Sequence, residues 1–114
     1  MTVVLRQRFG EYLMSEDEGM KLLPELRDAL EARDKVVLDF AGVRSVLSAF
    51  LNPSVGELYG VLPSDIVDKL LTVVNTTAVQ DKTLARVREH GRKYYHDPVY
   101  RAAQDAARRE LFSA

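Results

Sequence analysis

The chain has 114 residues, of which 46% are hydrophobic and 29% are charged, as in one ordinary globular domain. The net charge of −1 excludes recruitment of nucleic acid or membranes by a strong overall field. The absence of cysteine excludes disulfides and thiolate metal sites and fits a reducing compartment. The N-terminus does not read as a signal peptide, and no apolar run approaches the roughly 20 residues that span a bilayer. We therefore expect a cytoplasmic protein without a membrane span.

The first half of the chain predicts a strand, a helix and a second strand. Residues 2–9 are rich in residues that favour strands. Ser15 followed by Glu18 is a capping-box pattern, and leucines at helical spacing come after it. Pro24 lies inside this pattern, so it either kinks the helix or marks where the helix begins. Residues 35–40 form an apolar run that ends near an acid, as a buried strand of an α/β sheet does.

The second half predicts a helix at 48–59, a connection at 60–68, a third strand at 70–75 and a long helix at 77–95. The connection is long enough to contain a short further element. The side chains of the long helix that we expect to face the core are Val79, Leu84, Val87 and Tyr94. A last helix over 98–112 begins at a proline preceded by an aspartate, a favourable helix start.

The predicted order is β-α-β-α-β-α with an extra C-terminal helix. Strands that alternate with helices indicate an α/β fold with a small parallel or mixed sheet backed by helices. No repeat or linker divides the chain, so we expect a single domain over 1–114, with its core at 1–95 and a C-terminal helical extension at 98–112. The extension is amphipathic and packs either on its own core or on a second copy, so a homodimer is one expectation.

Three polar side chains stand at predicted element ends. Asp39 ends the second strand, where it either orients a ligand or accepts amides of the turn that follows. Ser48 and Ser54 lie near the start of the next helix, so each is either a helix cap or a candidate phosphorylation site. No base is close to these serines in sequence, and no Gly-x-Ser-x-Gly elbow is present. We therefore expect no catalytic residue and no enzyme.

Neither a metal nor a cofactor site is predicted. His90 and His96 are six residues apart, about 240° around a helix at roughly 100° per residue, so they cannot hold one metal ion as an i, i+4 pair does. Gly56 and Gly60 lack the spacing and the Lys-Ser/Thr ending of a phosphate-binding loop. We expect no metal and no cofactor.

A basic and aromatic stretch lies at 86–100, in the basic C-terminal part of an otherwise acidic chain. Its members are Arg86, Arg88, Arg92, Lys93, Tyr94, Tyr95 and Tyr100. Side chains of these kinds contact phosphates and stack on bases in nucleic-acid-binding proteins. Acids interrupt the stretch, so a solvated helix face and a partner-binding face are competing interpretations.

The residues Leu-Asp-Phe-Ala-Gly-Val at 38–43, followed by Ser-Ala-Phe-Leu-Asn at 48–52, resemble the STAS-like domains of unknown function. These are relatives of the STAS domain of anti-sigma factor antagonists, and the resemblance covers about residues 1–95. It implies a small mixed sheet backed by helices and a regulatory role, often opposite an ATPase of the anti-sigma kinase type. Typical antagonists carry Asp-Ser-Ser-Gly at this helix start, of which this chain keeps only the first serine. The corresponding residues are Leu47, Ser48, Ala49 and Phe50.

We therefore expect a non-enzymatic regulatory module that binds a protein partner, an anti-sigma-type ATPase by resemblance, through the loop and helix at 43–59. The predicted contact residues are Phe50, Leu51, Asn52, Glu57 and Tyr59. One helix cannot present all of them to a partner, so some belong to the core, and Phe50 is either a core residue or an interface anchor. The alternative expectation is a nucleic-acid-associated protein that uses the helix at 86–100.

Overall fold

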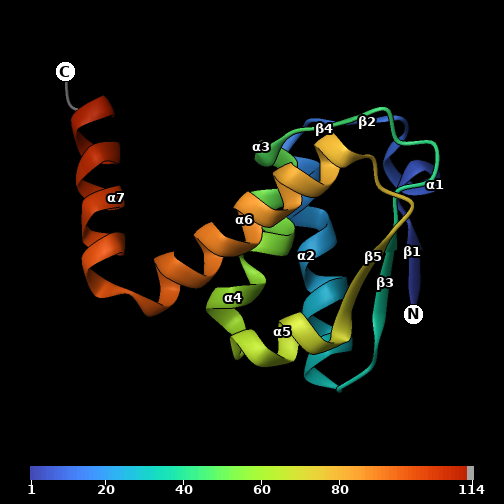
Figure 1. Ribbon diagram of the computed structural model, residues 1–114, viewed down its shortest axis with the longest axis horizontal. Coiled ribbons are helices and arrows are strands. Elements are labelled where there is room, and N and C mark those ends of the chain that lie inside the picture. Colours follow the sequence, from blue (N-terminus) through green and yellow to red (C-terminus); the bar gives the residue numbers. More distant parts are fainter. Residues whose placement is uncertain (113–114) are drawn as a thin grey trace.

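The computed structural model describes residues 1–112, which form two small parallel sheets and a set of helices (Figure 1). The larger sheet has the order β1-β3-β5, and its strands are β1 (Thr2–Val4), β3 (Val36–Asp39) and β5 (Leu71–Val74). Its register pairs Val3 with Leu38, and Leu38 with Val73. The predicted α/β class, with a small sheet backed by helices, is confirmed, and this sheet is parallel throughout.

The first predicted strand is correct only in its first half. β1 ends at Val4, and α1 (Leu5–Phe9) follows it directly. Leu5 is fully buried, whereas Arg6 and Arg8 are exposed. Over so few residues, a helical turn and a strand can both give this pattern, so the sequence did not distinguish them.

A second parallel pair, which the sequence pattern did not predict, flanks the first sheet. It consists of β2 (Tyr12–Leu13) and β4 (Ser45–Val46), with Leu13 opposite Val46. Both of these apolar residues belong to the core. Strands of two residues are too short to give a visible alternation in sequence.

The helix predicted after Ser15 is α2 (Glu16–Glu31). The Ser15 hydroxyl accepts the amide of Glu18 at 3.3 Å, as the capping pattern predicts. The helix begins at this cap and continues through Pro24, so the alternative start near Pro24 is wrong. Its leucines form the centre of the core, and the fully buried ones are Leu22, Leu26 and Leu30.

The helix predicted at 48–59 is divided into three segments. They are α3 (Ser48–Leu51), the π-helical segment η1 (Asn52–Gly56) and α4 (Leu58–Val61). Pro53 lacks an amide hydrogen, so the regular α-helical hydrogen-bond ladder is interrupted there. The amide of Glu57 reaches back five residues to the carbonyl of Asn52 at 2.9 Å, which is the π-helical bond.

The predicted connection at 60–68 contains part of a further helix, α5 (Ser64–Leu70). The long helix α6 (Ala78–His96) follows β5 and begins with a capping box between Thr77 and Gln80. Leu84 and Val87 face the core as predicted. The prediction for Val79 is wrong, because its side chain is 73% exposed. The neighbouring Gln80 takes the buried position instead, where its side-chain amide donates to the Val43 carbonyl at 3.0 Å.

The last helix, α7 (Pro98–Phe112), starts where the sequence predicts, and Asp97 caps it by accepting the amides of Val99 and Tyr100. Figure 1 shows α7 standing away from the sheet and joined to the end of α6. Two hydrogen bonds hold it there: Tyr94 donates to Asp105 at 2.7 Å, and Tyr100 lies 2.8 Å from Nδ1 of His90. Tyr94 is therefore half-buried against α7 rather than in the core. Among residues 1–112, no helix is both long and apolar enough to cross a membrane.

Candidate protein-binding surface

The small β2–β4 sheet presents a row of apolar side chains to solvent. Leu13 and Val46 point into the core, and their neighbours in sequence point outward because side chains alternate across a strand. The amide of Leu47 donates to the Leu13 carbonyl at 2.9 Å, which continues the pairing beyond β4. The outward side chains, which we call the β2–β4 patch, are Tyr12 (55% exposed), Met14 (45%) and Leu47 (46%). Exposed apolar side chains gathered in one place mark interaction sites more often than isolated ones do.

A groove of about 380 Å³ begins at Leu47 and continues between α3 and α6. We call it the α3–α6 groove. Thr83, Arg86 and His90 recur at helical spacing and form its wall on α6. The complete lining is Val46, Leu47, Ser48, Asn52, Thr83, Arg86, Val87 and His90. The groove therefore combines an apolar floor with basic and neutral polar groups and contains no acidic residue.

A second groove, of about 250 Å³, lies further along α6 and reaches α7. It shares Asn52 and His90 with the first groove but differs in charge, since Glu16 and Glu57 line it. The Tyr95 hydroxyl donates to Glu57 at 2.6 Å. Burial and this hydrogen bond raise the pKa of Tyr95 far above its ordinary value. Glu57 and Tyr95 are thus paired with each other in the lining of this groove, which also contains Arg108.

Three of the five predicted contact residues are fully buried: Phe50, Leu51 and Tyr59. Their prediction as partner contacts is wrong, because a partner cannot reach side chains that have no exposed surface. Of the two interpretations of Phe50, core residue or interface anchor, the first is correct. Its ring packs edge to face on Phe9 with centroids 5.3 Å apart. Asn52 is exposed and lines both grooves, and Glu57 is half-buried.

The two serines have different environments. Ser54 is fully buried, and its hydroxyl donates to the Phe50 carbonyl at 2.8 Å. The prediction of Ser54 as a phosphorylation site is therefore wrong, because no kinase can reach that hydroxyl. Ser48 is exposed at the start of α3 and lines the α3–α6 groove. The capping position of α3 is Leu47, so Ser48 is not the cap, and its modification stays a prediction.

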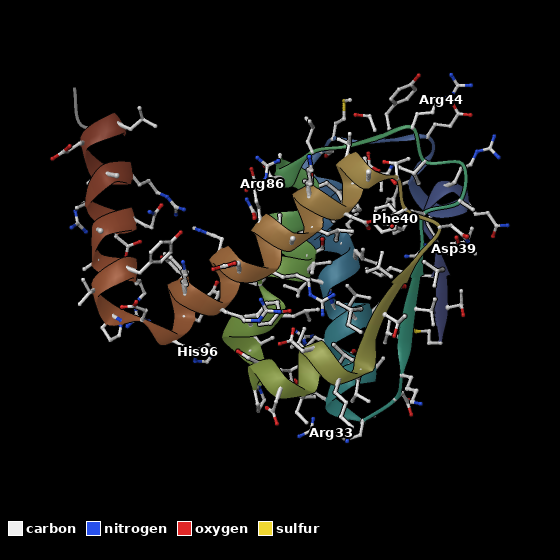
Figure 2. All side chains as sticks on the ribbon, in the orientation of Figure 1. Arg33, Asp39, Phe40, Arg44, Arg86 and His96 are labelled. Carbon is white, nitrogen blue, oxygen red and sulfur yellow. The ribbon has the colours of Figure 1, made fainter. Side chains whose placement is uncertain are left out.

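Of the two predicted roles of Asp39, orienting a ligand or accepting amides of the turn that follows, the structure shows the second. One carboxylate oxygen accepts both the amide of Ala41 and the side-chain amide of Asn75, each at 2.9 Å. The bond from Asn75 and then that from Ala41 lower the pKa of Asp39. Asn75 has a φ of 61°, a left-handed conformation that asparagine tolerates better than most residues. Asp39 thus joins the ends of β3 and β5, as its position in Figure 2 shows.

Most of the basic side chains in the stretch 86–100 are paired with acids. Arg88 and Arg92 both contact Asp68, with closest distances of 3.3 and 2.7 Å. Arg88 also donates to the Tyr59 hydroxyl at 2.9 Å, and that hydroxyl donates to Asp68 at 2.6 Å. We call these four residues the Asp68 network. Lys93 pairs with Glu89 at 3.2 Å. These pairs offset about half of the positive charge that the stretch could offer to nucleic acid.

Arg86 is the exception in this stretch, because no ion pair connects it to an acid in the part of the chain that the structure describes. In Figure 2 it lies on α6 beside α3. His90 and His96 point to different partners, the Tyr100 hydroxyl and the Tyr59 carbonyl. No group of three or more metal-ligating side chains occurs within residues 1–112.

Sequence reasoning singled out Ser48, Asn52 and Arg86, the last as a nucleic-acid contact, but missed the β2–β4 patch. Tyr12 lies in β2, a strand too short to recognise, and Met14 follows directly after it. The available signal was the run of large hydrophobic residues at 12–14 and the apolar pair at 46–47, in which residues on both faces of the strands are apolar.

The comparison with known families agrees with this architecture. The family model described as a STAS-like domain of unknown function (DUF4325) matches residues 18–81, from the first turn of α2 to the first turn of α6. No curated protein and no solved structure matches the chain. The matched segment contains β3, β5 and the α3–η1–α4 region, but not β2, α7 or Arg86. Because the match spans more than half of the chain, the protein belongs to this family of STAS-like domains.

Proposed function

We propose that this protein is a non-enzymatic regulatory module that binds a protein partner through the β2–β4 patch and the adjoining α3–α6 groove. The observation that carries the proposal is the exposure of Leu47, the residue shared by the patch and the groove. An ATPase of the anti-sigma type is the partner class that the resemblance suggests first. The alternative, nucleic-acid binding, has weaker support because Arg88 and Arg92 are occupied by Asp68.

The surroundings of Leu47 have the composition of a protein interface. Apolar side chains of the patch form a centre, and the polar Ser48 and Asn52 lie at its margin. The backbone under Leu47 is fixed, since its amide is bonded to Leu13 and Phe50 behind it is fully buried. A rigid apolar residue loses little conformational entropy on binding, which favours it as an anchor.

The proposal predicts that a photo-crosslinking residue, p-benzoylphenylalanine, captures one and the same protein from positions 47 and 14 in living cells. The matched control is position 61 on α4, because Val61 is 44% exposed and Leu47 is 46% exposed. We expect no capture from position 61. The captured protein is identified by mass spectrometry and purified, and its affinity is then measured by calorimetry with and without ATP.

With the purified partner, Leu47→Asp should weaken binding at least tenfold, about 1.4 kcal/mol, whereas Val61→Asp should leave it unchanged. Circular dichroism melting shows that both variants are folded. Equal capture from positions 47 and 61, or full affinity in Leu47→Asp, would contradict the proposal.

A cytoplasmic location is part of the same proposal. The absence of cysteine supports it, because no disulfide is needed to stabilise the fold. Fractionation of cells that express the natural protein, with detection by antibody, tests this point. Recovery with membranes or in the extracellular medium would contradict it.

A further inference from the structure

The lining of the α3–α6 groove includes an arginine but no acidic residue. Arg86 is the basic side chain of its lining, and none of the residues that line it is an aspartate or a glutamate. The other basic residues nearby are each in an ion pair: Arg88 and Arg92 share Asp68, and Lys93 contacts Glu89. Arg86 thus stands beside an open groove, and no carboxylate among residues 1–112 forms an ion pair with it.

The polar groups that face this groove are hydrogen-bond donors or can act as donors. Ser48 offers a hydroxyl and Asn52 a side-chain amide, across the groove from Arg86. His90 uses only Nδ1 in its contact with the Tyr100 hydroxyl, at 2.8 Å. When that hydroxyl donates to Nδ1, the ring hydrogen lies on Nε2 and makes the ring a donor. The arrangement can therefore surround an anionic oxygen pair with donors from both walls.

The floor of the groove is apolar, with Val46 and Val87, and it opens at Leu47 onto the β2–β4 patch. A free inorganic anion would leave this floor uncovered, whereas a side chain with an anionic head and an aliphatic stem fits both parts. A guanidinium can hold a carboxylate or a phosphate through two parallel hydrogen bonds, and such charged bonds are stronger than neutral ones.

We propose that the α3–α6 groove binds an anionic side chain of the partner protein, with Arg86 as the cation that holds it. The proposal rests on the proposed function, because it names the chemistry that the partner brings to the same surface. A glutamate or aspartate and a phosphorylated serine share this chemistry, and the experiment separates the two sources.

The test titrates the isotopically labelled full-length protein with three small probes and follows its amide and arginine Nε–H signals by NMR. The probes are N-acetyl-glutamate amide, N-acetyl-phosphoserine amide and, as uncharged control, N-acetyl-glutamine amide. We expect saturable shifts at Ser48, Asn52 and Arg86 with half-saturation on the order of 1–10 mM for an anionic probe. Saturation by glutamate identifies the carboxylate source, and saturation by phosphoserine alone identifies the phosphate source.

Arg86→Gln should raise the half-saturating concentration of the anionic probe at least tenfold. Arg86→Lys should raise it less, because lysine keeps the positive charge. The matched control is Arg101→Gln, since Arg101 is an exposed arginine on α7 that lines neither groove. Arg101→Gln should give the same half-saturating concentrations as the natural protein. Equal shifts with the glutamine probe, or unchanged titrations in Arg86→Gln, would overturn the proposal.

The crosslinking and titration experiments distinguish a failure of the anion site from a failure of the proposed function. If position 47 captures a partner whose affinity is the same for Arg86→Gln and the natural protein, the anion site is wrong and the partner surface stands. If the anionic probes bind at Arg86 but position 47 captures nothing, the groove binds anions and the proposed function is wrong.

Discussion

Asp68 is the residue that connects the C-terminal half of α6 to the α4–α5 region. It accepts a hydrogen bond from Tyr59 and contacts both Arg88 and Arg92. Burial alone would raise the pKa of Asp68, but the hydrogen bonds from Arg92 and Tyr59 and the two positive charges outweigh it, so the pKa is lowered. The guanidinium of Arg92 also lies over the Tyr59 ring, 5.1 Å from its centroid. The network therefore favours the ionised form of Asp68 in the folded protein.

Asp68→Asn should lower the free energy of unfolding at neutral pH by about 1–2 kcal/mol, because charged hydrogen bonds are lost and solvent screens part of their value. The folded pKa of Asp68 lies below the unfolded value of about 3.9, so this stabilisation is present above about pH 4 and is lost as pH falls through the folded pKa. Urea unfolding of both proteins from pH 7 to pH 2.5 checks this.

The matched control for this measurement is Asp65→Asn on the same helix, since Asp65 is exposed and forms no ion pair within residues 1–112. Its effect should stay within about 0.5 kcal/mol. A difference between the natural protein and Asp68→Asn that persists unchanged at the lowest pH would contradict the electrostatic explanation.

At this scale, sequence reasoning succeeds for local contacts and fails for distant ones. The turn role of Asp39 was one of its two predicted roles, because the Ala41 amide is two residues away. The partners of Asp68 come from positions nine to 24 residues away and could not be found by spacing. The burial of Ser54 likewise depends on how α2 packs on η1, which no local pattern contains.

Close packing of α2 on η1 determines which side of the segment 48–61 is exposed. A Cβ atom at Gly19 would lie 2.2 Å from the Phe50 carbonyl oxygen and 2.9 Å from the Pro53 side chain. Real Cβ atoms do not approach a backbone oxygen so closely, so only glycine permits this contact. The Phe50 carbonyl also accepts the hydroxyl of Ser54, which anchors the turn before the π-helical bond.

Gly19→Ala should destabilise the protein by about 1–3 kcal/mol or more, because the two backbones must separate and the core loses contact. Helix propensity alone would predict the opposite sign, since alanine is the better helix former. Thermal unfolding followed by circular dichroism measures the change. Met20→Ala is the control on the same helix, since Met20 is exposed, and it should change stability by less than about 0.5 kcal/mol. Stabilisation by Gly19→Ala would show that the close contact is absent.

The elements that the sequence predicts well are those with a side-chain cap. Ser15, Thr77 and Asp97 each begin a helix, and all three helices follow the predicted course. β2 and β4 were missed because two residues cannot show a period. The π-helical segment was missed because Pro53 leaves several helix starts equally compatible with the pattern.

At the scale of the whole molecule, α7 is an addition to a core that is complete without it. Its contacts are mainly with the end of α6, and Val99 and Leu111 are largely exposed. The sequence predicted the helix but not the surface on which it packs, because an amphipathic pattern shows only that one face of the helix is apolar. The same limit applies to the sheet, where alternation of elements allowed a parallel or a mixed arrangement.

A chain that ends at Asp97 should therefore still fold cooperatively. Its free energy of unfolding should fall by no more than about 2 kcal/mol, the approximate contribution of the Tyr94–Asp105 and His90–Tyr100 hydrogen bonds. Urea unfolding compares it with the full chain, and a chain that ends at Val87 is the control that should not fold. Loss of the cooperative transition in the longer truncation would mean that α7 is part of the core.

The β1-β3-β5 sheet also affects how fast the molecule folds. Every pair of neighbouring strands is parallel, and at least one complete helix separates its members in sequence. Closing such long loops costs entropy before any strand contact repays it, so sheets of this kind form slowly. Helices such as α2, with their caps beside them in sequence, form in microseconds or less. We therefore expect the pairing of the three short strands, rather than the formation of the helices, to limit the rate of folding.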